Sequence, residues 1–422
     1  MSVFVKNMRG ESLMPCSPRK ARLLLREGKA KVINYTPFTI QLTYATGETK
    51  QPVSIGIDLG TKYIGLAIQS ENKVIAKGEI ELRDDVKSLI ETRKIYRRSR
   101  RNRKTRYRKP RFDNRKRPDN WLPPSIQSRI DNTFMWIDKY MELLPNPTLT
   151  IEVGKFDVQK MINPDIEGID YQQGQTYGYH DVRYYVFARD NYTCQVCKKK
   201  GKILQTHHII YKSKGGTDRA NNLITVCTDC HNHKNHQEGE IFYKWMADKK
   251  KMPSYKETPF MNIIRKRVFE KYPNAYITYG SITTPKRKEL GLNKTHYNDA
   301  LVISGVEEGF IDNVGIFKIK QFRKKKRSLH EATARKGRKT KNTTSKRNVK
   351  NIKQLNGFYL NDRVKIYGKL GYITGFTGIS MAYVKDIDGN YITKPNKSYK
   401  QINLKECEFL NHNNNWQYVE NF

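Results

Sequence analysis

The chain has 422 residues, and its 80 lysines and arginines outnumber its 41 acidic residues by 39. A formal charge of this size predicts binding to a polyanion with a steep dependence on salt. The sequence contains no run of 18 apolar residues, and residues 1–20 lack the apolar stretch of a secretory signal, so we expect neither a membrane span nor secretion. Six cysteines without a disulfide framework favour a reducing, cytoplasmic environment.

Residues 1–51 indicate a small α+β module. A strand is expected at the N-terminus, followed by a helix that starts near Pro18 and stops at Gly28. Two further strands are expected on either side of Thr36-Pro37. Basic residues surround the leucines of the helix, so its polar face is positively charged.

Residues 53–82 have the alternating, β-branched pattern of three strands, which we interpret as a hairpin plus an edge strand. Turns are expected at Gly60-Thr61 and Glu71-Asn72. Asp58 lies within the first apolar strand. A buried carboxylate is costly unless it has a cationic partner, so Asp58 is a candidate metal ligand; the alternative is a carboxylate that caps a turn.

Two later segments add acidic residues of the same kind. Glu152 ends an apolar strand at 148–153. His296 and Asp299 are three residues apart in a predicted helix at 295–304, which places them on one face.

Two segments hold most of the excess charge. Residues 93–117 carry 15 basic residues and one acid, and residues 318–353 carry 16 and one, so 29 of the 39 excess charges lie in 61 residues. The first run contains aromatic residues and no proline before Pro110, which favours a continuous nucleic-acid-binding helix over a solvated face. Arginine suits bidentate phosphate contacts, and the candidates are Arg93, Arg97, Arg98, Arg100, Arg101, Arg103, Arg106 and Arg108. The second run favours an extended linker.

Residues 184–240 contain two Cys-x-x-Cys pairs, Cys194/Cys197 and Cys227/Cys230, separated by 29 residues. Two such pairs can supply the four thiolates of a tetrahedral structural zinc site. The alternative is four unrelated reduced cysteines. Cys16 and Cys407 remain outside the pattern.

The segment between and after these pairs resembles the ββα-metal unit of HNH endonucleases. The resemblance rests on HHI, GG, NNL and CTDCHNH in the family order. It implies that His208 activates water against a scissile phosphate, that His207 and His231 hold one divalent cation, and that Asn222 orients the base. A helix is expected over the His-rich segment at 231–236, and the roles of His233 and His236 stay open. The alternative is that the histidines complete the zinc site.

Residues 355–422 alternate β-forming residues with Gly turns and Asp388-Gly389, which predicts a small β module. A purely structural cap is one interpretation of this module.

The ordered set Asp58, Glu152, His296 and Asp299 resembles that of RuvC-type nucleases. With an Arg-rich helix between the first two residues and an HNH unit before the last two, the chain resembles the IscB family of transposon-associated nucleases. The opening SLMPCSPRKARLLLREGKAKVI also matches, although Ser12 replaces the first proline of that family's Pro-Leu-Met-Pro run.

This resemblance implies an α+β multidomain protein in which an RNase H-like (RuvC) mixed sheet is interrupted by a bridge helix and an HNH domain. The expected boundaries are 1–51 for the N-terminal module; 52–91, 119–180 (with a linker) and 251–317 for the RuvC-like parts; 92–118 for the bridge helix; 181–250 for the HNH domain; 318–354 for the basic linker; and 355–422 for the C-terminal module, which by resemblance reads a target-adjacent motif.

The resemblance implies an RNA-guided double-stranded DNA endonuclease of a bacterial or archaeal cytoplasm, associated with the nucleoid when on DNA. Its partners would be a structured guide RNA and target DNA, with the protein a monomer in the ribonucleoprotein. Two Mg²⁺ ions would serve the RuvC-like site, one Mg²⁺ the HNH site and Zn²⁺ the cysteines. The alternatives are a protein-only homing or resolvase-type nuclease and a non-catalytic ribonucleoprotein scaffold.

Overall fold

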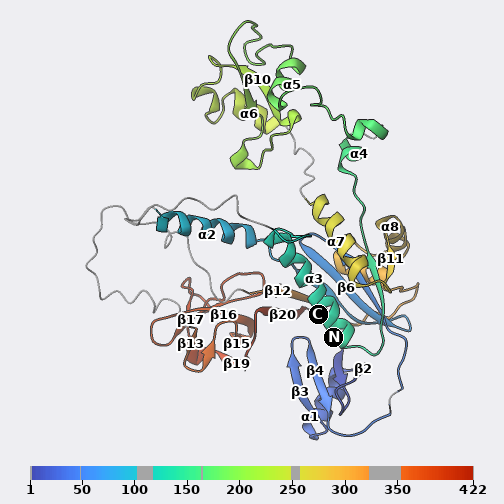
Figure 1. Ribbon diagram of the computed structural model, residues 1–422. Coiled ribbons are helices and arrows are strands. Elements are labelled where there is room, and N and C mark those ends of the chain that lie inside the picture. The colour runs from blue at the N-terminus through green and yellow to red at the C-terminus, as the bar shows by residue number, and fades with distance from the viewer. Residues whose placement is uncertain are drawn as a thin grey trace. The chain divides into compact units, whose positions relative to one another are not determined.

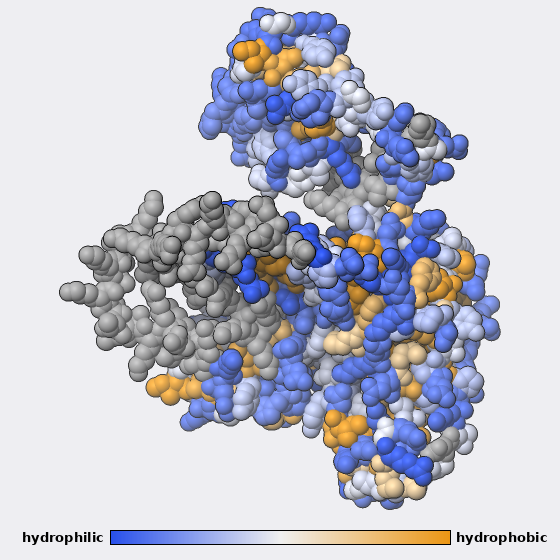
Figure 2. All heavy atoms as spheres, viewed as in Figure 1, coloured by the Kyte–Doolittle hydropathy of each residue, from blue (hydrophilic) through white to orange (hydrophobic). Residues whose placement is uncertain are grey.

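A computed structural model describes residues 2–47, 49–101, 117–162, 165–248, 257–322 and 353–421. The chain forms two compact units, Met1–Lys155 with Phe260–Phe422 and, separately, Phe156–Pro259 (Figure 1). Within the described ranges, no helix is both long and apolar enough to cross a membrane. Most residues on the face in Figure 2 are hydrophilic, and apolar residues appear there in scattered patches.

The first unit begins with a four-stranded sheet in the order β2-β1-β4-β3. Its elements are β1 (Val3–Lys6), β2 (Ser12–Cys16), α1 (Pro18–Arg26), β3 (Ala30–Tyr35) and β4 (Phe38–Leu42). The expected helix is present: the Ser17 hydroxyl accepts from the Lys20 backbone N–H at its start, and Gly28 has a φ of 68° just beyond its end. β2 was not expected, because Pro15 and Cys16 interrupt its short apolar pattern.

A seven-stranded mixed sheet follows, in the order β11-β8-β5-β6-β7-β12-β20. The strands are β5 (Ser54–Leu59), β6 (Tyr63–Ser70), β7 (Lys73–Glu81), β8 (Thr148–Glu152), β11 (Tyr276–Thr278), β12 (Ile316–Gln321) and β20 (Trp416–Asn421). The turns at 60–61 and 71–72 are confirmed. The expected edge strand is wrong: β7 is internal, because β12 pairs with it in parallel from more than 200 residues away.

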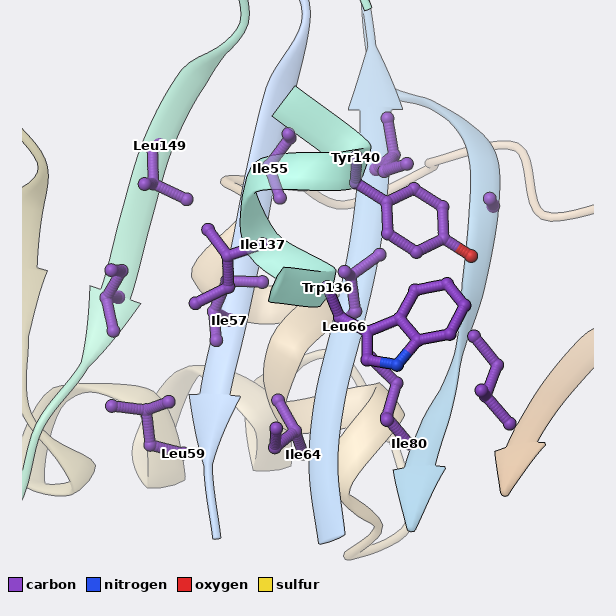
Figure 3. Close-up of a cluster of buried hydrophobic side chains, with 14 of the residues drawn as sticks. Ile55, Ile57, Leu59, Ile64, Leu66, Ile80, Trp136, Ile137, Tyr140 and Leu149 are labelled. Atoms are coloured by element: carbon purple, nitrogen blue, oxygen red, sulfur yellow. The ribbon is translucent and has the colours of Figure 1, made fainter. Parts of the chain in front are cut away.

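Helices cover both faces of this sheet. The helix α3 (Pro124–Glu142) packs Trp136, Ile137 and Tyr140 on one face (Figure 3). The helix α7 (Thr258–Lys271) contributes to the same core. Each large apolar side chain buried there contributes about 1.5–3 kcal/mol. Successive residues of a strand face opposite sides, so Gly56 and Asp58 lie on the other face from the core residue Ile57.

On that second face lie α8 (Gly280–Glu289) and α9 (His296–Ile303). The strands carry glycine where α9 crosses them. A Cβ atom at Gly56 would overlap the backbone of Ala300 and Ser304, and one at Gly65 would overlap the carbonyl group of His296. The absence of side chains there lets the helix backbone approach the sheet closely.

The basic helix α2 (Val86–Arg101) begins before its expected start at residue 92. Residues 102–116 of the expected bridge helix lie outside the described residues, as do residues 323–352 of the second basic run. Residues 117–118, also expected in that helix, are not helical.

The second unit holds α4 (Val158–Ile162), α5 (Val182–Arg189), β9 (Leu204–His208), β10 (Leu223–Cys227) and α6 (Ile241–Asp248), with short 3-10 turns between them. β9 and β10 form an antiparallel hairpin. The expected helix at 231–236 is wrong, because only a 3-10 turn forms at Lys234–His236. The Asn232 side chain accepts from the Asn235 N–H, and the Asn235 amide donates to the Cys230 carbonyl, so side chains replace helical bonds.

The C-terminal part of the chain forms the hairpin β13 (Gln354–Leu355) and β14 (Phe358–Tyr359) and a five-stranded antiparallel sheet. The sheet contains β15 (Arg363–Ile366), β16 (Lys369–Thr377), β17 (Met381–Lys385), β18 (Gln401–Asn403) and β19 (Glu408–Asn411). The last strand, β20, is not part of this sheet: it follows β19 and pairs with β12 of the main sheet (Figure 1). Residues 416–421, expected within the C-terminal module, therefore complete the main sheet, where Tyr418 is buried.

We predict that Gly65→Ala destabilises the protein by about 1–3 kcal/mol, because the new Cβ must displace the α9 backbone. Thermal and denaturant unfolding of the full chain measure the change. Gly47→Ala is the matched control, since a Cβ at Gly47 meets no atom within 4 Å. Equal stability of the two variants would contradict a tight helix–sheet contact.

Candidate functional site

The ends of two neighbouring strands bring the first two predicted carboxylates together. β5 and β8 are parallel, and their register pairs Asp58 with Glu152. The α9 helix supplies the other two predicted residues, His296 and Asp299, from its first turn. Strand register and helix packing thus gather all four residues around one end of the sheet.

Asp58 and Asp299 each contact a basic side chain. His296 Nδ1 lies 2.6 Å from Asp58 Oδ2, and this hydrogen bond raises the pKa of His296 although burial opposes it. Arg287 Nε lies 2.7 Å from Asp299 Oδ1. Burial and then the charge of Asp58 raise the pKa of Asp299, and Arg287 acts in the opposite direction. Each of these two carboxyl groups is therefore paired with a basic side chain that offsets its negative charge.

Glu152 is the carboxyl group with spare coordination capacity. Its Oε2 is buried and has no hydrogen-bond partner. Its pKa is raised, first by burial and in part by Asp58 and Asp299, while a hydrogen bond from Thr283 lowers it. An orphaned carboxyl oxygen beside two further carboxyl groups is a donor set that fits a hard divalent cation.

The four residues do not yet form a tight cage. Among the described residues, no three of their ligand atoms lie within 4.8 Å of one another, whereas two other groups of side chains do. Asp58 contacts His296 and Asp299 contacts Arg287.

Sequence reasoning missed Thr283 and Arg287, two buried residues one helical turn apart on α8. One contacts Glu152 and the other Asp299. Their spacing of four residues is the only signal in the sequence, and it is shared by many helix faces that bind nothing.

In the second unit, the four predicted cysteines converge. The Sγ atoms of Cys194, Cys197, Cys227 and Cys230 all lie within 4.8 Å of one another. The first pair lies in a turn and the second follows β10, and the Cys227 backbone N–H donates to Cys194 Sγ at 3.2 Å. Four thiols at this spacing fit a tetrahedral zinc site. Cys16 and Cys407 lie elsewhere, as expected.

Burial and hydrogen bonding shift the pKa values of two of these thiols in opposite directions. Burial opposes ionisation of Cys194, but backbone N–H donors of Cys197, Cys227 and Val196 lower its pKa to about 7. Burial and the neighbouring Cys227 and Cys197 raise the pKa of Cys230 to about 12. Backbone donors thus stabilise the thiolate of Cys194, whereas burial and the neighbouring cysteines disfavour ionisation of Cys230.

A second cluster joins three imidazoles, His207, His231 and His236, with ligand nitrogens within 4.8 Å of one another. Two of them were predicted metal ligands; His236 was left open in the sequence, and the structure adds it. His207 Nε2 is buried without a partner, and burial followed by His236 and His231 lowers the pKa of His207 to about 3. The ring stays neutral and keeps the lone pair that a metal needs. The ring of Phe242 on α6 stacks on the His207 ring, with the ring centres 4.0 Å apart.

His208, the predicted base, faces away from this cluster, since neighbouring residues of a strand alternate. Its Nε2 lies 2.7 Å from Asp218 Oδ1, and Lys212 Nζ lies 2.8 Å from the same oxygen. While that contact holds, Nδ1 is the nitrogen that can accept a proton. Sequence reasoning missed Asp218, which lies in the loop just after Gly215 and Gly216.

Asn222 is fully buried, and its amide holds the loop between the two strands of the hairpin. It accepts from the Ile210 N–H at 2.9 Å and donates to the carbonyls of Ile210 and Thr217. These bonds fix the segment that carries Asp218. Direct orientation of His208 by Asn222 stays a prediction.

The predicted nucleic-acid contacts are described only in part. Arg93, Arg97 and Arg98 are exposed on α2. Arg100 and Arg101 belong to the same helix, and Arg103, Arg106 and Arg108 lie outside the described residues.

The structure thus brings carboxyl groups together at one end of the main sheet, and it clusters thiols and imidazoles in the second unit. Residues 194–237 match the sequence model of the family described as HNH endonuclease, and residues 3–174 match the family described as RRXRR protein. The first range contains the cysteine and histidine clusters, and the second contains Asp58, Glu152 and the basic helix.

Two known proteins are similar to part of this chain. Anaredoxin of Nostoc sp. (strain PCC 7120 / SAG 25.82 / UTEX 2576) is 29% identical over 69 residues, which are 16% of this chain and 88% of that protein. The Type II-C Cas9 enzyme from Actinomyces naeslundii is a similar solved structure at 12% identity and a TM-score of 0.24, with 62% of this chain and 60% of that chain covered. The chain thus spans less than two thirds of that enzyme.

The chain joins an RRXRR region to an HNH endonuclease region, and the predicted resemblance to an IscB-like HNH nuclease is confirmed at that level. The HNH match supports a nuclease that uses a divalent metal. Its fold is a mixed α/β multidomain architecture.

We predict that Cys194→Ser lowers the zinc content of the purified protein and destabilises residues 156–259 by several kcal/mol, because it removes a buried ligand. Metal analysis and limited proteolysis measure these two effects. Cys16→Ser is the control, since Cys16 lies outside the cluster. Unchanged zinc content in Cys194→Ser would refute a four-cysteine site.

Proposed function

We propose that the protein is an RNA-guided double-stranded DNA endonuclease with two nuclease sites. The observation that carries this proposal is the division of metal donors into a carboxylate site on the main sheet and an imidazole site in the HNH unit. The Arg-rich helix between Asp58 and Glu152 supports it, because a nuclease that read DNA by its own side chains would not need such a helix within its catalytic fold.

The first site is proposed to be RuvC-like, on an RNase H-like sheet. Antiparallel β5, β6 and β7 followed by parallel β8, with carboxyl groups at the ends of β5 and β8 and on α9, support this assignment. Asp58, Glu152, His296 and Asp299 would hold two Mg²⁺ ions, which supply charge stabilisation to a phosphate undergoing in-line attack. Arg287 and Thr283 hold the Asp299 and Glu152 carboxyl groups in place.

The second site is proposed to cut the guide-paired strand. His207, His231 and His236 would hold one divalent cation, which offsets charge on the phosphate. Three imidazole nitrogens suit a transition-metal ion better than Mg²⁺. His208 accepts a proton from water at Nδ1 and Asp218 holds the ring through Nε2. Asn222 keeps the loop of Asp218 in position through its three hydrogen bonds. The RuvC-like site would cut the displaced strand.

In this proposal the basic helix and the N-terminal module bind a structured guide RNA, and the C-terminal module reads a short motif beside the target. The exposed arginines on α2 suit phosphate contacts. The protein would act as a monomeric ribonucleoprotein in a bacterial or archaeal cytoplasm, bound to the nucleoid while on DNA.

Co-purification tests RNA guidance. The full chain is expressed with its native flanking DNA, purified without nuclease treatment, and the bound RNA is sequenced. We expect one structured RNA species with a variable guide end. Heterogeneous RNA that is removed by moderate salt would overturn RNA guidance and favour a protein-only nuclease, because nonspecific phosphate contacts weaken steeply with salt.

Single substitutions test the assignment of two sites. We predict that Asp58→Asn leaves only a nick in the guide-paired strand and that His208→Ala leaves only a nick in the displaced strand, each with at least a 100-fold loss at the altered site. Strand-specific end-labelling measures both. Asp84→Asn and His233→Ala are the matched controls, because Asp84 is an exposed residue between β7 and α2 and His233 lies outside the imidazole cluster. A single variant that abolished both cuts would contradict independent sites.

A further inference from the structure

Buried polar side chains hold the loop that joins β19 to β20. It comprises residues 412–415 and has the sequence His-Asn-Asn-Asn. Four buried polar side chains surround it: Asn361, Asp362, Asn411 and Gln417. Burying such groups costs free energy unless they are hydrogen-bonded, so their partners indicate what they do.

Those partners are mainly the backbone of the loop itself. Asn361 Nδ2 donates to the Asn414 carbonyl at 2.5 Å, and Gln417 Nε2 donates to Asn361 Oδ1 at 2.9 Å. Asn411 Nδ2 donates to the His412 carbonyl at 3.1 Å. The loop is therefore fixed by side-chain amides that cannot reach solvent.

The neighbouring elements hold the loop further. The Phe322 backbone N–H, just beyond β12, donates to the Asn415 carbonyl at 2.5 Å. Trp416, the next residue, packs edge-on against Trp136 of α3 with ring centres 5.2 Å apart. The loop thus joins the five-stranded sheet to the main sheet at a fixed place.

His412 is positioned in the same way. Asp362 has no exposed surface, and its Oδ2 lies 2.9 Å from His412 Nδ1. The histidine ring nevertheless stays exposed, with a side-chain exposure of 59%. The rings of Phe409 and Tyr359 flank it at 4.7 and 5.0 Å and are themselves exposed.

The backbone of the loop is fixed by hydrogen bonds, but the side chains of Asn414 and Asn415 take no part in them. Asn414 and Asn415 are exposed, and within the described part of the chain their side-chain amides make no hydrogen bond. Two preorganised amides beside a fixed imidazole and exposed rings form a surface whose donors and acceptors are available to a ligand.

We propose that Asn414, Asn415 and His412 read base edges of duplex DNA in the major groove. Phosphate groups only accept hydrogen bonds, whereas an asparagine amide donates and accepts at once, which matches the N6 and N7 atoms of adenine. Phe409 and Tyr359 supply apolar surface for a thymine methyl group. A-form RNA is disfavoured because its deep, narrow major groove excludes side chains. This inference rests on the proposed function and assigns the target-adjacent reading to particular residues.

A binding selection tests the inference without requiring cleavage. The full chain with its co-purifying RNA is mixed with short duplexes that contain a randomised segment, and the retained duplexes are sequenced. We expect the unaltered protein to enrich particular bases at neighbouring positions. Asn414→Ala and Asn415→Ala should each reduce that enrichment at one position by about 5- to 150-fold. Gln354→Ala, which removes an exposed amide from the same module, should leave it unchanged.

The possible outcomes separate the alternatives. The inference would be overturned if the unaltered protein showed no base preference. It would also be overturned if both asparagine variants kept the base preference of the unaltered protein. An equal loss of affinity for all duplexes would show a nonspecific contact, which also overturns it. A change in the co-purifying RNA would assign the loop to RNA. Because the readout is retention of DNA, failure of either nuclease site leaves this result interpretable.

Discussion

The close approach of α9 to the main sheet is the contact on which the carboxylate site depends. It is possible only because Gly56 and Gly65 place no Cβ atom between the strands and the helix backbone. At the same end of the sheet, a Cβ at Gly60 would lie 2.9 Å from the His296 ring. Three positions without side chains therefore set the distance at which His296 meets Asp58, and the hydrogen bond between them follows from that distance.

A second constraint is electrostatic, and both units meet it. Carboxyl groups on the main sheet are matched by His296 and Arg287, since like charges this close raise one another's pKa. In the HNH unit the thiols and the imidazoles form separate clusters. Soft thiolates suit zinc, whereas neutral imidazoles suit several divalent cations, so the two donor sets differ in the metal that each would favour.

The C-terminal strand connects the main sheet to the five-stranded sheet within the first unit. β20 completes the main sheet beside β12, and the loop before it is held by buried amides from the five-stranded sheet. Tyr372 of the five-stranded sheet donates to the Tyr418 carbonyl of β20 at 2.5 Å. The loop that we propose contacts DNA is therefore fixed in position relative to the main sheet. The sequence did not predict this connection, because residues 416–421 were assigned to the C-terminal module together with the strands that precede them.

The sequence by itself determined what depends on local spacing and residue chemistry. Cys194 and Cys197 share a turn, His296 and Asp299 share a helix face, and Asp58 interrupts an apolar strand, so each pattern carried its own physical reason. Tertiary structure alone decided the long-range pairings: β12 against β7, Arg287 against Asp299, His236 in the imidazole cluster and Asp218 on His208. These contacts join residues whose separation in the chain follows no period, so no local pattern could predict them; folding brings them together through packing of the whole sheet and its helices.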